Sequence, residues 1–231
     1  MKWLALLAMI FAAGCAKLPP GGPGDQGKRI VLTMILDAEL NESFVYIFPL
    51  RVSNDVNPPD DGPTPVIAPP WGNGLVAGNA THFIQYEPGR SQPFVLYKFL
   101  DTSLLNYVEI GAIEIYDDIP ADDPNAEQIE RKRFRFEIEL NDLADSPADA
   151  LLLETVQINF LTMERRGSGS DSRAWDALGN GSIELKSWVT LTLRTAATYN
   201  NQGFNFLEPQ DPDVADPSLD IRDWQVDIRL Q

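Results

Sequence analysis

Apolar and polar residues alternate with a period of two along much of the chain, which is the pattern of β-strands with one buried face. The alternation is clearest at residues 131–140, where Phe134, Phe136 and Ile138 are separated by charged side chains. The segment 223–230 repeats the pattern around Trp224. The pattern predicts nine strands, at residues 29–39, 43–52, 81–87, 92–100, 107–116, 131–140, 155–164, 183–195 and 223–230.

Helical periodicity is limited to two short segments, residues 125–131 and 148–153, each long enough for one or two turns. Many half-buried strands with little helix favour stacked antiparallel sheets. We therefore expect an all-β fold, an antiparallel β-sandwich of immunoglobulin-like or jelly-roll type with long loops. A closed barrel is the alternative arrangement of the same strands.

Three connections between the predicted strands are long, namely residues 53–80, 165–182 and 196–222. Loops of more than about 15 residues are uncommon in compact domains and often carry function. The connections supply the candidate binding residues, which are Trp71, Asn73, Trp175 and Tyr199. The alternative is that the loops pack over the sheets as covers and bind nothing.

The N-terminus has the three parts of an export signal. Lys2 gives a positive start, residues 3–13 are uncharged and largely apolar, and small residues then lead into Cys15. The apolar stretch is shorter than the roughly 20 residues that a transmembrane helix needs. Ala-Ala-Gly-Cys at residues 12–15 resembles the lipobox of bacterial lipoproteins, with Ala12 where Leu is usual. An ordinary secretory signal with a chance cysteine is the alternative.

The resemblance implies that Cys15 carries a diacylglyceryl group and that the new N-terminus carries a third chain such as palmitate. Two or more acyl chains give stable membrane anchoring. Ala16 stands where Asp often retains such lipoproteins in the inner membrane, which implies the outer membrane in a cell with two membranes. The expected organisation is a signal peptide at 1–14, a Pro- and Gly-rich tether at 15–28, and the β-sandwich domain at 29–231.

The chain is strongly acidic, with 18 basic and 34 acidic residues and a formal net charge of −16. Such a surface repels phosphate backbones, so nucleic acid is not expected as a partner. Contact with the membrane is expected through the acyl chains on Cys15. A protein or a glycan remains as the class of partner.

Little in the sequence points to catalysis. Cys15 is the only cysteine and His82 the only histidine. Acylation of Cys15 would remove its thiol, and with it Cys–His catalysis, disulfides and Cys-based zinc sites. The chain has no Gly-x-Ser-x-Gly elbow, and His82 begins a predicted strand, where a structural role is expected. We predict no catalytic residue.

Two groups of aspartates are candidates for calcium, which prefers hard oxygen ligands at short spacing. They are Asp211, Asp213, Asp216 and Asp220, and Asp117, Asp118, Asp122 and Asp123. The first group contains Pro212 and Pro217 and lacks the glycine of a calcium loop, which favours solvated acidic turns. We therefore expect no cofactor, with calcium as the alternative.

The segment Pro69-Pro70-Trp71-Gly72-Asn73-Gly74 predicts a tight turn, because Gly and Asn accept positive φ angles. Together with residues 61–66 it resembles uncharacterised bacterial lipoproteins, a resemblance that implies no activity and no residue roles. Aromatic residues near the loops could form platforms on which sugars stack, namely Trp71, Trp175, Tyr86 and Tyr199.

These observations favour a lipid-anchored envelope protein whose β-sandwich has a non-catalytic binding or structural role. A carbohydrate-binding surface lipoprotein is the alternative. A glycan hydrolase that uses a pair of carboxylates comes third.

Overall fold

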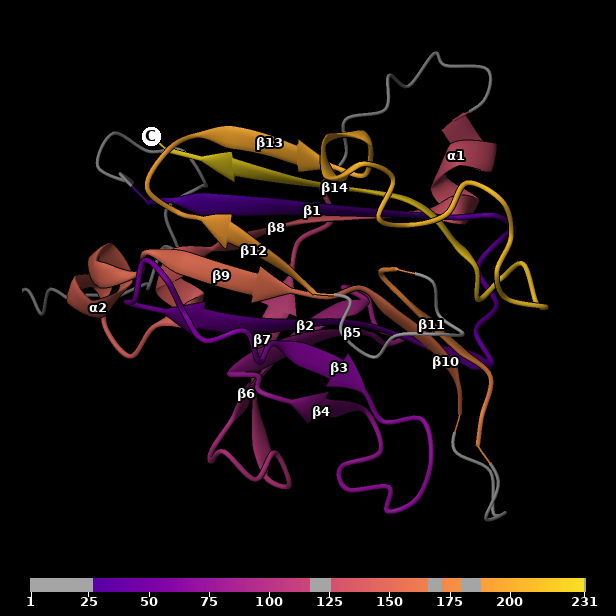
Figure 1. Cartoon of the computed structure of the whole chain (residues 1–231), viewed down its shortest axis with the longest axis horizontal. Helices are drawn as coiled ribbons and strands as arrows, with labels where there is room; N and C mark the ends of the chain where they lie inside the picture. Colours follow the sequence, from indigo (N-terminus) through magenta and orange to yellow (C-terminus); the bar gives the residue numbers. More distant parts are fainter. Residues whose placement is uncertain (1–26, 117–125, 166–171, 180–187, 231) are drawn as a thin grey trace, which may run out of the picture.

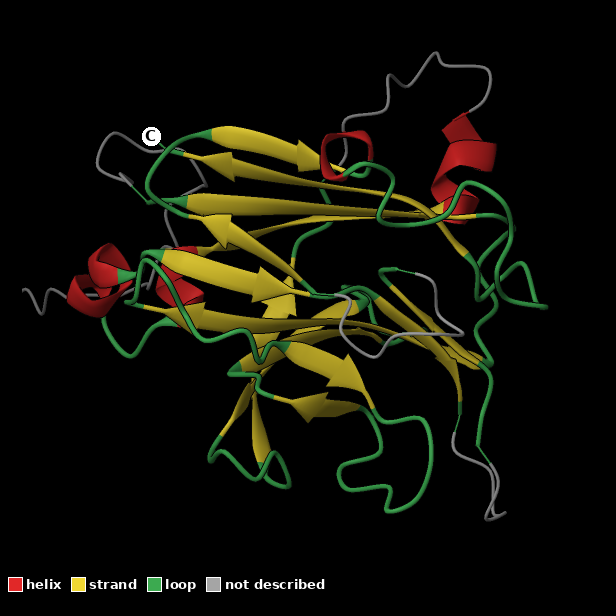
Figure 2. Cartoon of the chain, viewed as in Figure 1, coloured by secondary structure: helices red, strands yellow, loops and turns green. Residues whose placement is uncertain are grey.

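The computed structural model describes residues 27–116, 126–165, 172–179 and 188–230, and their regular structure is almost entirely β-strand (Figure 1, Figure 2). The strands are β1 (Arg29–Leu36), β2 (Phe44–Ser53), β3 (Pro63–Pro65), β4 (Val76–Gly78), β5 (His82–Tyr86), β6 (Phe94–Phe99), β7 (Tyr107–Ile113), β8 (Arg133–Glu139), β9 (Thr155–Ile158), β10 (Leu161–Glu164), β11 (Trp175–Ala177), β12 (Val189–Thr192), β13 (Ala197–Asn200) and β14 (Ile221–Arg229). The helices are α1 (Ala126–Lys132) and α2 (Pro147–Leu152), with short 3-10 turns at Leu140–Leu143 and Gln202–Phe204.

Twelve of the strands form two antiparallel sheets that pack face to face, and β3 and β4 form a separate two-stranded sheet (Figure 1). The smaller sheet has the order β13-β14-β1-β8. The larger sheet has the order β11-β10-β2-β5-β6-β7, with β9 also paired to β2 and β12 paired to β9. Within the described residues neither sheet closes on itself. The predicted antiparallel β-sandwich is therefore confirmed, and the closed barrel is wrong for this part of the chain.

Strand β8 shows the alternation that the sequence predicts. Its apolar side chains are buried between the sheets, and its charged side chains lie on the outer face of the smaller sheet. There they pair with charges on neighbouring strands. Arg29 on β1 lies 2.8 Å from Glu137, and Arg135 lies 3.5 Å from Asp227 on β14.

The main core lies between the two sheets and is rich in aromatic side chains. Phe48 of β2 makes four edge-to-face contacts at centroid distances of 4.8–6.4 Å, with Phe94, Phe134, Phe136 and Phe160. Each such pair contributes about 0.5–1.5 kcal/mol beyond the burial of its area. These contacts join β2, β6 and the β9–β10 segment of the larger sheet to β8 of the smaller one.

Strand β2 is buried on both faces. Phe48 and Leu50 face the main core, whereas Val45 and Ile47 belong to a second apolar cluster on the other face of the larger sheet. Val76 at the start of β4 contributes to the second cluster. Figure 1 shows the β3–β4 hairpin as a further layer on that face. Residues 53–80, predicted as a long loop, thus contain the two short strands β3 and β4 and cover the outer face of the larger sheet.

The segment predicted as one strand at residues 155–164 consists of β9 and β10. Both pair with β2 in one continuous register. The interruption lies opposite Pro49 of β2, which has no backbone N–H to donate to the ladder. Asn159 lies at the interruption, and its side-chain Oδ1 accepts hydrogen bonds from the N–H groups of Phe160 and Leu178.

Four observed strands were not predicted, and each of them lies in one of the three long connections. They are β3, β4, β11 and β13, of three or four residues each. An alternation of period two is not recognisable over so few residues. The two predicted helical segments are confirmed as α1 and α2.

Candidate functional site

The side chain of Asn73 stabilises the turn that the sequence predicts between β3 and β4. Its Nδ2 donates to the carbonyl oxygens of Val76 and Leu104, and its Oδ1 accepts from the N–H groups of Leu75 and Val76. The Gly74 N–H donates to the Trp71 carbonyl across the turn at 2.6 Å. Every hydrogen-bonding atom of this candidate binding side chain is therefore already used within the protein.

Trp71 is packed into the same loop by Arg173. The Arg173 guanidinium lies 5.7 Å from the centre of the Trp71 ring and donates to the carbonyl oxygens of Val66 and Gly74. The side chains of Trp71 and Arg173 are 9% and 7% exposed. Trp71 thus offers little ring surface on which a sugar could stack.

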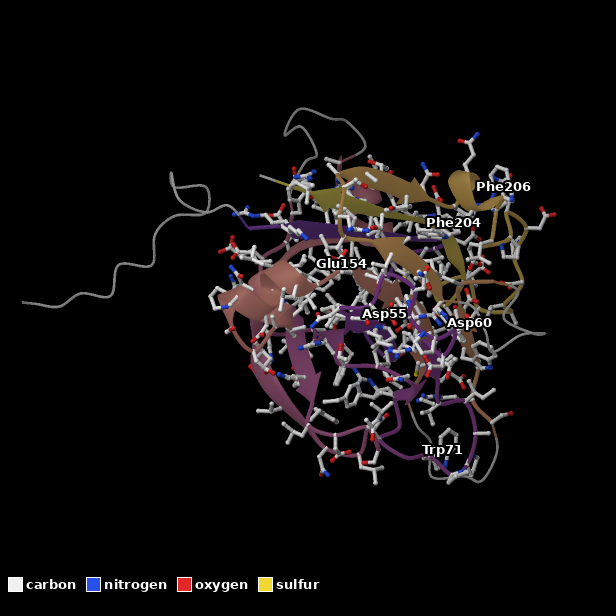
Figure 3. All side chains as sticks on the ribbon, turned by 60° about the vertical axis from the view of Figure 1, so that its left-hand side comes forward. Asp55, Asp60, Trp71, Glu154, Phe204 and Phe206 are labelled. Atoms are coloured by element: carbon white, nitrogen blue, oxygen red, sulfur yellow. The ribbon has the colours of Figure 1, made fainter. Side chains whose placement is uncertain are left out.

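The remaining candidate aromatics are half-buried and lie apart. Trp175 packs against the second apolar cluster, whereas Tyr86 and Tyr199 pack against the main core. The Tyr199 ring lies 6.3 Å from that of Phe204, and Figure 3 shows Phe204 far from Trp71. The structure therefore does not gather these candidate residues into one binding platform.

His82 is buried in β5 and is 2% exposed. Its Nδ1 lies 2.9 Å from Thr81 Oγ1, and its Nε2 has no hydrogen-bond partner among the described residues. Burial, and secondly the positive charge of Lys98, lower the pKa of His82 from 6.5 to about 4, although the charge of Asp145 opposes this. The imidazole is therefore neutral at pH 7 and shielded from solvent, as expected for a structural histidine.

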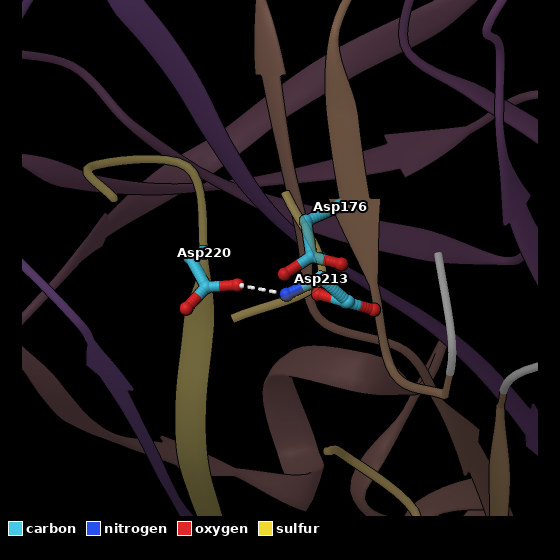
Figure 4. A group of neighbouring side chains, drawn as sticks. All are labelled: Asp176, Asp213 and Asp220. Atoms are coloured by element: carbon cyan, nitrogen blue, oxygen red, sulfur yellow. Dashed lines mark hydrogen bonds between the residues drawn. The ribbon is translucent and has the colours of Figure 1, made fainter. Parts of the chain in front are cut away.

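Three aspartates converge where β11 meets the start of β14 (Figure 4). Asp176 lies on β11, Asp220 directly precedes β14, and Asp213 lies in the connection before it. One carboxylate oxygen of each lies within 4.8 Å of the others, and no other such group of three occurs in the described residues. Asp176 and Asp220 are 0% and 2% exposed. We call these three residues the aspartate cluster.

Hydrogen bonds of the aspartate cluster connect the two sheets. The Asp176 carboxylate accepts from the N–H of Ala177 at 2.8 Å and from the N–H of Ile221, the first residue of β14, at 2.7 Å. Asp220 Oδ1 accepts from the Asp213 N–H at 3.2 Å (Figure 4). Asp176 therefore joins the edge of the larger sheet to the smaller sheet.

Glu208 is a fourth buried carboxyl group beside the cluster, with 0% exposure. The Asn201 side chain fixes its main chain, donating to the Glu208 carbonyl and accepting from the Glu208 N–H, both at 2.9 Å. Neither carboxyl oxygen of Glu208 makes a hydrogen bond of normal geometry with the described residues, although the Gly179 N–H is near enough to lower its pKa. The backbone is thus held by two hydrogen bonds, while the carboxyl group makes none of normal geometry with the described residues.

Burial raises the pKa of Asp176 to about 8 and that of Glu208 to about 11, and it also raises the pKa of Asp220. Neighbouring carboxylates raise these pKa values further. In the described part of the chain, no Lys or Arg is among the groups that shift them. The site therefore concentrates acidic groups in a buried place, where Asp176 and Glu208 are largely neutral at pH 7 unless a cation binds.

Of the four aspartates that the sequence suggested for calcium, the structure places Asp213 and Asp220 together. Asp211 is exposed, and Asp216 accepts from the Ser218 N–H in a local turn. Asp176 and Glu208 were not foreseen. The second suggested group at residues 117–123 and the lipidation site Cys15 both lie outside the described residues.

A groove of about 410 Å³ lies beside Trp188, and its surface is mostly apolar although most of its lining residues carry polar groups. The lining includes Asp60, Asp61, Thr64, Asn79, Thr102 and Trp188. The Trp188 ring lies directly on Gly62, where a Cβ would come within 2.4 Å of the indole. Trp188 is half-buried and was not among the aromatic candidates chosen from the sequence.

A hollow of about 470 Å³ beside Tyr86 is lined largely by core aromatics and β8.

No protein-family model, no curated protein and no solved structure matches the chain. Among the described residues, no helix is both long and apolar enough to cross a bilayer.

The sole imidazole gives a direct test of the environment of His82. We expect its NMR resonances to titrate with a pKa of about 4. Because the folded pKa lies below the unfolded value of 6.5, the unfolded state binds more protons between these values. Acidification from pH 6.5 to 4 should therefore cost up to about 3 kcal/mol of unfolding free energy through this group. His82→Gln should lack that part of the acid sensitivity, and titration near pH 6.5 would contradict burial.

Proposed function

We propose that this protein is a lipid-anchored envelope protein whose β-sandwich has a binding or structural role and catalyses no reaction. It would be exported, acylated at Cys15, and attached in the outer membrane if the cell has two membranes. Its long connections and sheet surfaces would then face a protein or a surface polymer.

The anchor proposal depends on the Ala-Ala-Gly-Cys tetrapeptide at residues 12–15. It is supported by the apolar stretch before it and by the Pro- and Gly-rich residues after it, which suit a tether. Cys15 is the only cysteine of the chain, and acylation explains why an exported protein has a cysteine without a disulfide partner.

The proposal of a non-catalytic role is supported by the burial of three groups whose pKa values are strongly shifted. Asp176, Glu208 and His82 are each at most 2% exposed. An acid, base or nucleophile has to come within hydrogen-bond reach of its substrate. Buried groups of this kind instead suit a structural role, in contrast to the open cleft with paired carboxylates that a glycan hydrolase uses.

Metabolic labelling tests the anchor. We expect incorporation of radiolabelled palmitate into the native protein and none into Cys15→Ser, because no other cysteine can be acylated. Ala16→Ser, one residue along, should label normally and serves as the matched control. Undiminished labelling of Cys15→Ser would show that the protein is not anchored in this way.

The groove beside Trp188 favours carbohydrate binding as a second candidate function. The half-buried indole of Trp188 provides an apolar surface for the C–H face of a sugar ring. Carboxylate, amide and hydroxyl groups of Asp60, Asn79 and Thr102 surround it and could bind the sugar hydroxyls. A small number of polar groups around an apolar surface is the usual composition of a ligand site.

A glycan array together with co-sedimentation on purified peptidoglycan tests the second candidate. For any glycan that binds, Trp188→Ala should raise the dissociation constant at least tenfold, which corresponds to about 1.4 kcal/mol. Phe206→Ala removes an aromatic side chain that is 47% exposed and lies outside the groove, and it should leave binding unchanged. Equal affinity of Trp188→Ala and the native protein would remove the groove from consideration.

A further inference from the structure

The aspartate cluster places like charges together where solvent does not reach them. Asp176 and Asp220 are almost completely buried, and Asp213 lies with one oxygen within 4.8 Å of an oxygen of each. Like charges at this separation in a poorly solvated site repel strongly. A folded protein relieves such repulsion by protonation or by binding a cation.

Glu208 is a second and independent sign of a missing positive ligand. Its side chain is 0% exposed, and its carboxyl oxygens make no hydrogen bond of normal geometry with the described residues. Nearby Asp176, Asp213 and Asp220 raise the pKa of Glu208, so its carboxyl group lies near the cluster, although outside the group of three whose oxygens are all within 4.8 Å of one another. Because Asn201 holds the Glu208 backbone through two hydrogen bonds, this placement is built into the fold.

The geometry of the cluster suits calcium. Calcium takes six to eight oxygen ligands at about 2.3–2.6 Å, so two ligands of one ion lie at most about 5 Å apart. The three aspartate oxygens lie within 4.8 Å of one another and meet this limit. Carboxylates can bind calcium through one oxygen or two, which accommodates side chains that come from separate segments. The donor set consists of oxygen alone and contains no His or Cys, which argues against zinc.

We propose that Asp176, Asp213 and Asp220, with Glu208 beside them, bind one calcium ion that links β11 to β14. The ion neutralises the buried carboxylates of Asp176, Asp220 and Glu208. It also fixes the connection 201–220, because Asp213 and Asp220 are seven residues apart in that connection while Asp176 belongs to the opposite sheet. The site is independent of the lipid anchor and of the groove beside Trp188.

Protonation of the buried carboxyl groups is the competing explanation, and calcium titration separates the two. The full-length protein, purified in detergent and freed of metal with EGTA, is titrated with CaCl2 in about 0.15 M salt, which screens exposed charges beyond about 8 Å. We expect one ion per chain by calorimetry. At calcium concentrations near 100 times the dissociation constant, the Tm should rise on the order of 5–10 °C.

Asp213→Asn and Asp211→Asn form a matched pair, since both remove one charge from the same connection and only Asp213 belongs to the cluster. Asp213→Asn should lose the calcium-dependent rise in Tm, and in EGTA it should be at least as stable as the native protein because one repelling charge is gone. Asp211→Asn should keep the full rise. Asp176→Asn is a second cluster variant whose amide oxygen can still accept one of the two backbone hydrogen bonds.

The titration also has outcomes that overturn the proposal. One is the absence of stoichiometric calcium binding by the native protein. Another is a Tm that is not raised by calcium at roughly 10 mM, which is about tenfold above the dissociation constant of the weakest extracellular sites. An equal rise in Asp213→Asn and Asp211→Asn would assign calcium binding to the acidic surface. Native calorimetry decides the question even if neither cluster variant folds.

Discussion

Strand β2 has no face turned to solvent, and this constraint determines how the rest of the chain is arranged. One face carries Phe48 in the middle of the aromatic core between the sheets, and the other carries Val45 and Ile47. A two-layer sandwich covers only the first of these faces. The segment after β2 therefore has to cross back over the larger sheet, where β4 and Ala80 close the second cluster. The turn around Asn73 and the packing of Arg173 on Trp71 hold this cover in place.

The requirement for a cover limits where the protein can bind anything. The Asn73 side chain is hydrogen-bonded within the protein, and the Trp71 ring is packed against Arg173. Trp188, in contrast, lies at the edge of the cover, against Gly62. The surface left for a partner is thus the rim of the cover and the outer faces of the sheets. On the smaller sheet that outer face is a set of ion pairs such as Arg29 with Glu137, which keeps it polar.

The alternation of β8 made the sandwich predictable, because a strand with one buried face requires a second layer. The short strands could not be predicted, since β3 and β11 are defined by pairing with distant segments and not by their own pattern. Two of the four acidic residues of the site could be predicted from the sequence. Spacing placed Asp213 and Asp220 in one group, but Asp176 joins them only through the docking of β14 against β11. Glu208 is brought near them by the path of the connection 201–220, where Asn201 holds its backbone. Likewise, burial of Trp71 depends on Arg173, about a hundred residues away in sequence.

The acidic residues of the chain have two roles. Most of the 34 acidic residues act in solvent, where a net charge of −16 is tolerated. Asp176, Asp220 and Glu208 lie inside, where such charge is relieved either by protonation or by the calcium ion that we propose. A crystal soaked in CaCl2 and measured at long wavelength tests this most directly. We expect one anomalous peak at about 2.3–2.6 Å from carboxylate oxygens of Asp176, Asp213 and Asp220. A map without that peak, with the carboxyl groups hydrogen-bonded to one another, would contradict the central claim.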